Sequence, residues 1–327
     1  MPPLSDIRDL IERSHRVLIA SHVDPDGDAI GSQLAFATYL RQLGKEVFMV
    51  RDSEVPAKYR FLDGVGAIAH VDSFPDEFAV DTAVILECPT LERIGRGGRW
   101  LTGDVKIVNI DHHYESGDFG TVNWIDPTKS SVGEMLFELF DAMGYDMPPE
   151  VAEHLFTAIM TDTGRFRYQG TSPRTMEIAG RLIAAGAQPK KITDHVYYRL
   201  PASTMKLTGM VMATLEYAAD NAVCILTLTN KMLAEAGAES SESDGLVDFT
   251  LSTDGVEIGV LLKEQDENST RVSLRSRDRV NVAELAGVYG GGGHYNASGC
   301  TVPMGLAEAK KELIGLMTDA LKKKTGN

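Results

Sequence analysis

Cysteine is scarce in this chain, and its scarcity excludes two ways of stabilising a small domain. The three cysteines, Cys88, Cys224 and Cys300, lie far apart and form no Cys-x-x-Cys pair. Neither a disulfide framework nor a zinc ribbon is therefore expected, and a reducing cytoplasm is the natural compartment. The segment Met1–Asp6 has neither the basic start nor the apolar run of a secretion signal, which supports the same expectation.

Basic residues and long apolar runs are also in short supply. The chain has 32 lysines and arginines against 47 aspartates and glutamates, which gives a formal net charge of −15. Such a chain offers no broad basic surface for long duplex nucleic acid, although bound divalent ions would still admit a short anionic substrate. No apolar segment reaches the roughly 20 residues that a membrane helix needs, so no membrane partner is expected.

What the chain does have is a regular alternation of strand-like and helix-like patterns from about residue 5 to residue 187. Strands separated by helical lengths predict βαβ units and an α/β fold with a mostly parallel sheet. The expected strands are Val17–Ala20, Glu46–Val50, Thr82–Leu86 and Val105–Ile110. The expected helices are Ala29–Leu43, Val132–Met143, Pro149–Met160 and Arg174–Ala185.

The pattern changes after residue 205, where strands follow one another. Strands are expected at Ala222–Leu228, Val256–Leu262 and Arg271–Ser276, and helices at Val282–Tyr289 and Leu306–Lys322. This order predicts a second, smaller α+β domain. We therefore divide the chain into an α/β domain over residues 1–187, a helical linker over 188–205 and an α+β domain over 206–327.

Two clusters of histidine and aspartate each follow directly after an expected strand. Residues 22–28 read His-Val-Asp-Pro-Asp-Gly-Asp, and Asp111-His112-His113 follows the strand that ends at Ile110. Because ligands of an open α/β sheet gather beyond the carboxyl ends of its strands, we expect the clusters to meet. Imidazole with several carboxylates suits Mn²⁺, Mg²⁺, iron or zinc, and these ligands are too many for one ion. A two-metal hydrolase is the sharpest interpretation.

Structural roles are open for some of these acids. A proline and a glycine exclude a regular strand, so His22, Asp26 and Asp28 are expected on a loop before a helix. Asp28 is a candidate helix N-cap, and Asp24 is a candidate for an Asx turn. Those roles explain one or two acids, but they do not explain His22 or the second cluster.

Two further acids, Glu87 and Asp162, fit the same site. Glu87 directly follows the strand Thr82–Leu86, where a carboxylate is able to bridge two ions; alternatively it begins a helix. Asp162 ends an apolar helical segment. The helix dipole disfavours an acid at that end, which favours a functional role over a structural one.

These motifs resemble the DHH phosphoesterase superfamily, and the resemblance covers nearly the whole chain. It is carried by the loop His22–Asp28, by Glu87, by Asp111-His112-His113, by Thr161–Gly164 and by Gly290–Gly299. The last of these, Gly-Gly-Gly-Gly-His-x-x-Ala-x-Gly, resembles the signature of a DHH-associated C-terminal domain. Within the superfamily, the two-domain layout is similar to the bacterial oligoribonucleases (nanoRNase type) that also dephosphorylate 3′-phosphoadenosine 5′-phosphate (pAp).

The resemblance implies a dinuclear Mn²⁺ site, with Mg²⁺ or another divalent ion as the alternative. Six residues would be the metal ligands by motif position: His22 and Asp26 on one ion, Asp28, His112 and Asp162 on the other, and Glu87 between them. Asp111 and His113 would complete the catalytic group, with His113 behind the ligands or facing the substrate. The superfamily usually has aspartate at the bridging position, so Glu87 is expected to retain activity with an altered level or metal preference.

The four glycines before His294 predict a phosphate-binding segment. Backbone without side chains can approach a phosphate closely, and successive N–H groups can form an anion-binding nest; a flexible hinge is the alternative. Arg275 favours phosphate binding over the hinge, because an arginine side chain can donate two hydrogen bonds to the oxygens of one phosphate. The expected substrate contacts are Arg275, Ser276, Gly291, Gly292, Gly293 and His294. Arg165–Tyr168 is a further candidate, whose aromatic rings could equally be packing residues.

The sequence therefore predicts hydrolysis of a terminal phosphate or phosphodiester by a metal-activated hydroxide, in a cleft between the two domains. Expected substrates are short single-stranded RNA oligonucleotides, cleaved to mononucleotides, and pAp, converted to AMP. One alternative is a phosphodiesterase for cyclic or linear dinucleotides (cyclic di-AMP or pApA), which would use the same residues. Another is a nucleotide sensor without turnover, marked by Glu87. The apolar helices at Val132–Met143 and Pro149–Met160 leave open whether the protein forms a homodimer.

Overall fold

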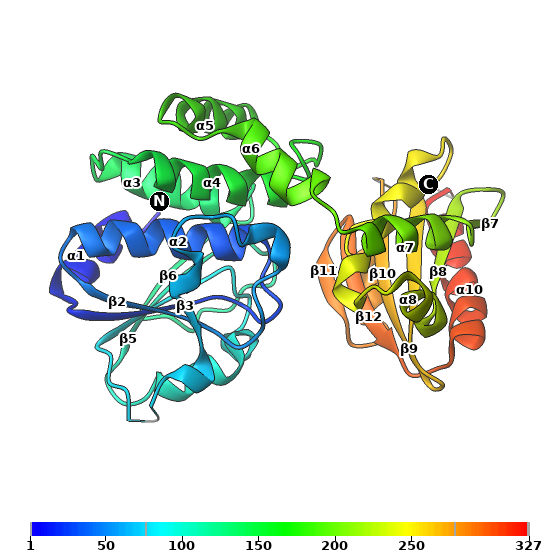
Figure 1. The fold of residues 1–327 in the computed structure, drawn as a ribbon, viewed down its shortest axis with the longest axis horizontal. Helices are drawn as coiled ribbons and strands as arrows, with labels where there is room; N and C mark the ends of the chain where they lie inside the picture. The colour runs from blue at the N-terminus through cyan, green and yellow to red at the C-terminus, as the bar shows by residue number, and fades with distance from the viewer. Residues whose placement is uncertain (1, 76, 278, 326–327) are drawn as a thin grey trace. The chain divides into compact units, whose positions relative to one another are not determined.

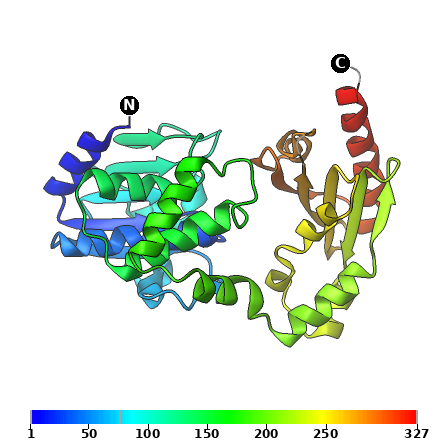
Figure 2. The same cartoon turned by 90° about the horizontal axis from the view of Figure 1, so that it is seen from above.

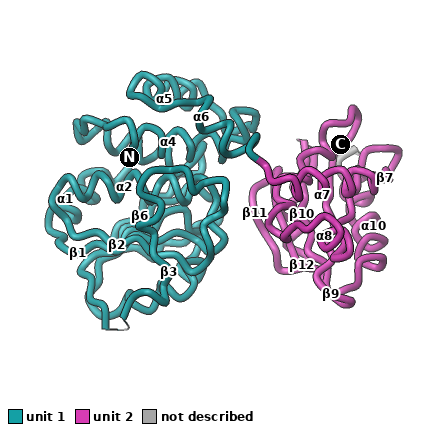
Figure 3. The backbone as a smooth tube through the Cα atoms, viewed as in Figure 1, with its two compact units in different colours: residues 1–199 teal, residues 200–327 magenta. Residues whose placement is uncertain are grey.

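The computed structural model describes residues 2–75, 77–277 and 279–325, which belong to two compact units. Unit 1 is Met1–Arg199 and unit 2 is Leu200–Asn327 (Figure 3). Each unit has its own sheet and its own hydrophobic core. Among the described residues, no helix combines the length and apolarity that spanning a bilayer requires.

Unit 1 contains a six-stranded parallel sheet, as the alternating pattern predicts. Its strands in chain order are β1 (Arg16–Ala20), β2 (Glu46–Arg51), β3 (Ile68–His70), β4 (Thr82–Leu86), β5 (Lys106–Asp111) and β6 (Val122–Ile125). They are arranged in the order β3-β2-β1-β4-β5-β6, with every neighbouring pair parallel. The order reverses between β1 and β4, which is where open α/β sheets bind their ligands.

Helices cover one face of this sheet (Figure 1). They are α1 (Leu4–Arg13), α2 (Gly27–Gln42), α3 (Val132–Ala142), α4 (Pro149–Asp162), α5 (Pro173–Ala184) and α6 (Pro189–Thr193). Helix α4 packs on α2 and α3, and α5 packs on α4. A short π-helical turn, Asp194–Tyr198, follows α6. The opposite face is covered by irregular chain, from which Ile94 and Trp100 pack against Leu18 and Ile85.

Small residues let α2 pack closely against α4. A methyl group at Gly31 would lie 2.4 Å from the carbonyl oxygen of His154, and one at Gly27 would lie 2.3 Å from Oγ1 of Thr161. These distances leave no room for a side chain at either glycine. The packing therefore holds the start of α2 against the end of α4, which are the two places where predicted metal ligands lie.

Unit 2 is a mixed sheet with helices on both faces, which confirms the predicted α+β arrangement (Figure 2). Its strands are β7 (Glu216–Ala218), β8 (Val223–Leu228), β9 (Ile258–Asp266), β10 (Ser269–Ser276), β11 (Gly292–His294) and β12 (Ala297–Val302). The order is β11-β12-β10-β9-β8-β7, and only β8 and β9 run parallel. One face carries α9 (Val282–Gly287) and α10 (Leu306–Thr325), and the other carries α7 (Ala202–Met212) and α8 (Asn230–Ala236).

The close packing of α2 on α4 generates a stability prediction. We expect Gly31→Ala to lower the free energy of unfolding by about 1–3 kcal/mol, because the added methyl group overpacks the helix contact. Gly180→Ala is the matched control: Gly180 lies in α5 with open space around it, so alanine should stabilise that helix by about 0.5–1 kcal/mol. Urea unfolding followed by tryptophan fluorescence measures unit 1, which contains both tryptophans, Trp100 and Trp124. Equal stability of the two variants would contradict the prediction.

His154 generates a prediction about pH. Its Nε2 lies 2.9 Å from the carbonyl oxygen of Asp63, and burial, assisted by the charge of Lys191, lowers its pKa from 6.5 to about 4. Above pH 6.5 the imidazole is neutral in both the folded and the unfolded state. As the pH falls from 6.5 to 4, the unfolded state takes up the proton first, so unit 1 loses stability.

The expected loss over this interval is about 3 kcal/mol, because one pKa unit corresponds to about 1.4 kcal/mol. His154→Gln should flatten this part of the curve, since an amide can still donate to the Asp63 carbonyl and does not titrate. Unfolding free energies between pH 4 and 8, measured with a metal chelator present, test this. A curve for the variant that is parallel to the wild-type curve would refute it.

Candidate metal centre

The loop after β1 brings His22 and Asp26 together. Nδ1 of His22 lies 2.8 Å from the carbonyl oxygen of Val23, and Nε2 lies 4.0 Å from Oδ1 of Asp26. Asp26 is the N-cap of α2, since its Oδ1 accepts a hydrogen bond from the backbone N–H of Ala29 at 3.0 Å. The cap is therefore Asp26, and the sequence-based suggestion that Asp28 is the N-cap is wrong.

Asp28 lies inside the first turn of α2 and is completely buried. Its Oδ1 accepts hydrogen bonds from Oγ of Ser32 at 3.0 Å and from the N–H of Gly133 at 2.8 Å. Its Oδ2 accepts one from the N–H of Val132 at 2.7 Å. The carboxylate thus lies at the N-terminus of α3, where unpaired N–H groups and the helix dipole favour a negative charge.

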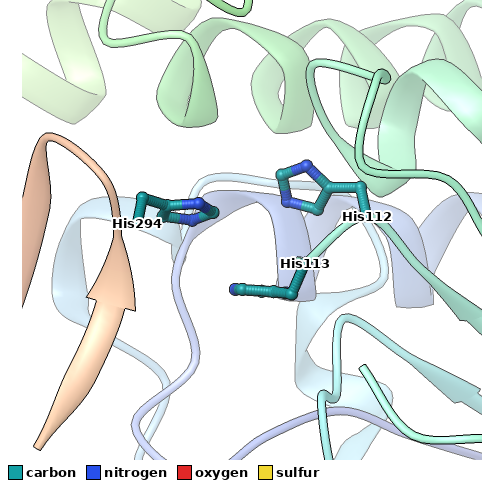
Figure 4. A group of neighbouring side chains, drawn as sticks. All are labelled: His112, His113 and His294. Atoms are coloured by element: carbon teal, nitrogen blue, oxygen red, sulfur yellow. The ribbon is translucent and has the colours of Figure 1, made fainter. Parts of the chain in front are cut away.

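The end of β5 presents Asp111, His112 and His113. Oδ1 of Asp111 accepts hydrogen bonds from the N–H of His112 at 2.9 Å and from Nδ1 of His113 at 2.8 Å. Burial raises the pKa of Asp111, but the hydrogen bond and charge of His113 outweigh it and leave the pKa below its ordinary value. The imidazole rings of the two histidines lie side by side, with centroids 5.0 Å apart (Figure 4).

His112 faces two carboxylates from other elements. Its Nε2 lies 3.4 Å from Oε1 of Glu87, at the end of β4, and 3.2 Å from Oδ2 of Asp162, at the end of α4. Its other ring nitrogen, Nδ1, lies 3.2 Å from the carbonyl oxygen of Lys129. One imidazole therefore connects the ends of a strand and a helix that are 75 residues apart in the chain (162 − 87).

Glu87 has an energetically unfavourable position. It is buried, its backbone is left-handed with φ 59°, and its Oε2 has no hydrogen-bond partner in the described structure. Burial raises its pKa well above the ordinary value, and the charges of Asp28 and Asp162 add to this against the opposing charge of His112. Residues held in such conformations cluster at functional sites, where the surrounding structure enforces them.

Asp162 shares this crowding. Burial raises its pKa to about 8, and the charges of Asp28, Asp26 and Asp111 reinforce the shift against the opposing charge of His112. An acid with so high a pKa requires a nearby cation or proton to be stable in this environment. Both Glu87 and Asp162 thus indicate an excess of buried negative charge.

The donor atoms within unit 1 are close enough to hold metal ions. Three sets of residues each have ligand atoms within 4.8 Å of one another, and Glu87 belongs to all of them: His22, Asp26 and Glu87; Asp28, Glu87 and His112; Glu87, Asp111 and His113. Divalent cations fit this environment, because the donors are imidazole and carboxylate and the negative charge is uncompensated. The structure therefore brings together the six predicted metal ligands, Asp162 through its contact with His112, and it places Asp111 and His113 beside them.

The residues predicted to bind substrate lie in unit 2. Nε of Arg275 donates to Oδ1 of Asp248 at 2.8 Å, so this arginine already has a carboxylate partner. Ser276 is buried, and its Oγ has no hydrogen-bond partner in the described structure. The hydroxyl of Ser276 is therefore buried without a partner and is not exposed for a contact, whereas Arg275 would have to share its guanidinium with Asp248.

The glycine run includes a short strand that the sequence analysis does not predict. Gly292, Gly293 and His294 form the short edge strand β11, which pairs with β12. A methyl group at Gly291 would lie 2.2 Å from the carbonyl oxygen of Gly299. Glycine is therefore needed at this position because the hairpin is too closely packed for a side chain. Gly292, in contrast, has open space where a side chain would be, and its backbone is exposed.

Comparison with known proteins agrees with this geometry. The model of the DHH family, N-terminal domain, matches residues 16–159, and the model of the DHHA1 domain matches residues 220–323. The bifunctional oligoribonuclease and PAP phosphatase NrnA of Thermus thermophilus is 35% identical over 88% of this chain and 84% of its own length. Its counterpart in Bacillus subtilis is 28% identical over 88% and 89%.

The solved structures include a similar fold. An exopolyphosphatase-related protein from Bacteroides fragilis has a TM-score of 0.91 at 28% identity, covering 98% of this chain and 97% of that one. Sequence motifs, buried donor atoms and relatives thus agree along nearly the whole length of the chain. The chain belongs to the DHH family of phosphoesterases, with a DHH domain followed by a DHHA1 domain.

Proposed function

We propose that this protein hydrolyses short oligoribonucleotides to mononucleotides and pAp to AMP, using bound divalent metal ions. The observation that carries the proposal is the position of Glu87 in each of the three ligand sets within unit 1. The relatives with whole-chain similarity are named for these two activities, which supports the choice of substrates. A buried centre of this composition suits phosphoester hydrolysis, because the divalent ions that it would hold would place positive charge beside the negative charge of a phosphate.

The proposed ligand roles follow the donor sets. His22 and Asp26 would hold one ion, Asp28, His112 and Asp162 the other, and Glu87 would lie between them. We propose Mn²⁺ as the native ion, and two such ions would supply a hydroxide at neutral pH and neutralise the phosphate.

His113 is the residue best placed to contact the substrate beside this centre. Asp111 accepts a hydrogen bond from Nδ1 of His113 and thereby fixes the ring. Nε2 is then directed to the centre, 3.5 Å from Oε1 of Glu87. A ring held in this way is able to donate a hydrogen bond to a phosphate oxygen without losing its orientation. Asp111 is therefore proposed to act through His113.

Recognition of the nucleotide is proposed to involve Arg275, Ser276, Gly291, Gly292, Gly293 and His294 of unit 2. In unit 1, Arg165 and Arg167 follow Asp162 on a turn whose residues 164, 165 and 166 all have left-handed backbone. The two guanidinium groups stack on Tyr197 and Tyr168 and form no ion pair with the described residues. Exposed arginines on so constrained a turn are suited to bind a phosphate.

Turnover of candidate substrates tests the proposed function. With Mn²⁺ present, a 5′-labelled RNA dinucleotide should yield mononucleotides and pAp should yield phosphate. His112→Ala should abolish both activities, whereas His15→Ala, which changes an exposed histidine before β1, should not. Assays of the three proteins on the dinucleotide, pAp and cyclic di-AMP give the answer. Hydrolysis of cyclic di-AMP alone would assign the protein to dinucleotide signalling, and nucleotide binding without any turnover would make it a sensor.

Replacement of Glu87 tests the metal centre without a catalytic assay. Glu87→Gln removes one buried charge from beside Asp28 and Asp162, so the metal-free protein should melt at a higher temperature. The rise in melting temperature on adding Mn²⁺ should shrink, because the variant lacks a proposed ligand. Glu87→Asp should keep the response to metal but change its relative size for Mn²⁺ and Mg²⁺. A Glu87→Gln protein with the full response to metal would exclude Glu87 as a ligand.

A further inference from the structure

We infer that Glu134, a buried carboxylate outside the ligand set, is a positioning residue that fixes the orientation of His112 through the backbone of Lys129. The inference rests on the proposed function, since it concerns how the proposed metal ligands are held. It arises from the segment between β6 and the first turn of α3, residues 129–134, which contains none of the residues predicted from sequence motifs.

This segment contacts two proposed ligands at once. The carbonyl oxygen of Lys129 lies 3.2 Å from Nδ1 of His112, which comes from β5. The N–H groups of Val132 and Gly133 donate to the carboxylate of Asp28, which comes from α2. A shift of the segment would therefore move or release a histidine and an aspartate together.

The contact with Lys129 determines which nitrogen of His112 is available to a metal ion. A carbonyl oxygen only accepts hydrogen bonds, so Nδ1 must carry a proton to make this contact. In the neutral ring, Nε2 then has the lone pair, and Nε2 is the atom that faces Glu87 and Asp162. A backbone carbonyl that holds a histidine in this way selects the tautomer and the ring orientation that a metal ligand needs.

Glu134 fixes the position of residues 129–134 through contacts with Lys129, Ser130 and Ser131. Its side chain is buried, and its Oε2 accepts hydrogen bonds from Oγ of Ser130 at 2.6 Å and from Oγ1 of Thr175 at 2.8 Å. Its backbone N–H donates to Oγ of Ser131, the N-cap of α3, at 3.0 Å. Nζ of Lys129 lies 3.8 Å from its Oε1. Glu134 thus connects the residues beside the critical carbonyl to α5, which carries Thr175.

A buried carboxylate is expensive unless its partners are precisely arranged, and an apolar residue of similar size often serves stability better. Oε2 of Glu134 accepts two hydrogen bonds, and these connect the loop before α3 and the first turn of α3 with α5. The contact with Thr175 joins α3 to α5. The additional hydrogen bond to Ser130, next to Lys129, is the one that positioning of His112 explains.

The experiment compares Glu134→Ala with Glu138→Gln. Glu138 lies one turn further along α3 and pairs with Nζ of Lys129 at 2.7 Å, but none of its contacts reaches Ser130. Titration calorimetry with Mn²⁺ should show a 10- to 100-fold loss of affinity in Glu134→Ala, of the order seen when a ligand's supporting partner is removed. Glu138→Gln should remain within about threefold of wild type, and Glu134→Gln should recover most of the loss, because an amide oxygen also accepts from Ser130.

A second readout reports on the ring itself. Nitrogen NMR of the metal-free protein, labelled in its eight histidines and recorded at a pH high enough to leave His112 neutral, should show the proton of His112 on Nδ1 in wild type and a mixture of tautomers in Glu134→Ala. If Glu134→Ala does not fold, Ser130→Ala removes the link and leaves the contact between Glu134 and Thr175 intact. Its Mn²⁺ affinity should then fall at least threefold.

The outcomes separate the two proposals. A folded Glu134→Ala or Ser130→Ala protein with wild-type Mn²⁺ affinity and an unchanged His112 signal overturns the role of Glu134. A wild-type protein that binds no Mn²⁺ overturns the proposed metal-dependent function instead. Loss of melting temperature without loss of metal affinity would show that Glu134 only joins α3 to α5.

Discussion

Mutual repulsion among buried carboxylates is the constraint on which unit 1 depends. Glu87 and the buried Asp28 lie close to Asp162, and burial penalises the charged forms of Glu87 and Asp162. No arrangement of helices and strands would gather these groups for the sake of stability alone. The fold tolerates them because backbone N–H groups, two histidines and, in our proposal, divalent cations balance the charge.

The packing of unit 1 holds these carboxylates close to the groups that neutralise their charge. The reversal of strand order between β1 and β4 brings together the loops that carry His22 and Glu87. Glycines at the start of α2 permit contact with the end of α4, and Asp28 reaches the N-terminus of α3 as a result. The same helices, α2, α3 and α4, also contribute apolar side chains to the hydrophobic core of unit 1, so the charged centre and the core are held by the same packing.

Much of this arrangement was accessible from the sequence, and the exceptions have physical reasons. Long apolar runs such as Val105–Ile110 identified the central strands, and the dense His and Asp motifs identified the centre. The edge strands β3 and β6 were missed because they have three and four residues and little periodicity. The carbonyl of Lys129 could not be predicted, because a backbone atom leaves no mark in the choice of side chain. The short strand β11 within the glycine run was also missed, because composition does not reveal its partner strand β12.

The separation into two units has a consequence for how such enzymes diversify. Every proposed metal ligand belongs to residues 1–199, whereas Arg275, Ser276 and the glycine run belong to residues 200–327. In our proposal, hydrolytic chemistry and much of nucleotide recognition are therefore carried by distinct modules. Substitutions in the second module can change which ligand it binds without altering the charges of the metal centre in the first. The same hydrolytic chemistry can therefore be combined with different substrate specificities.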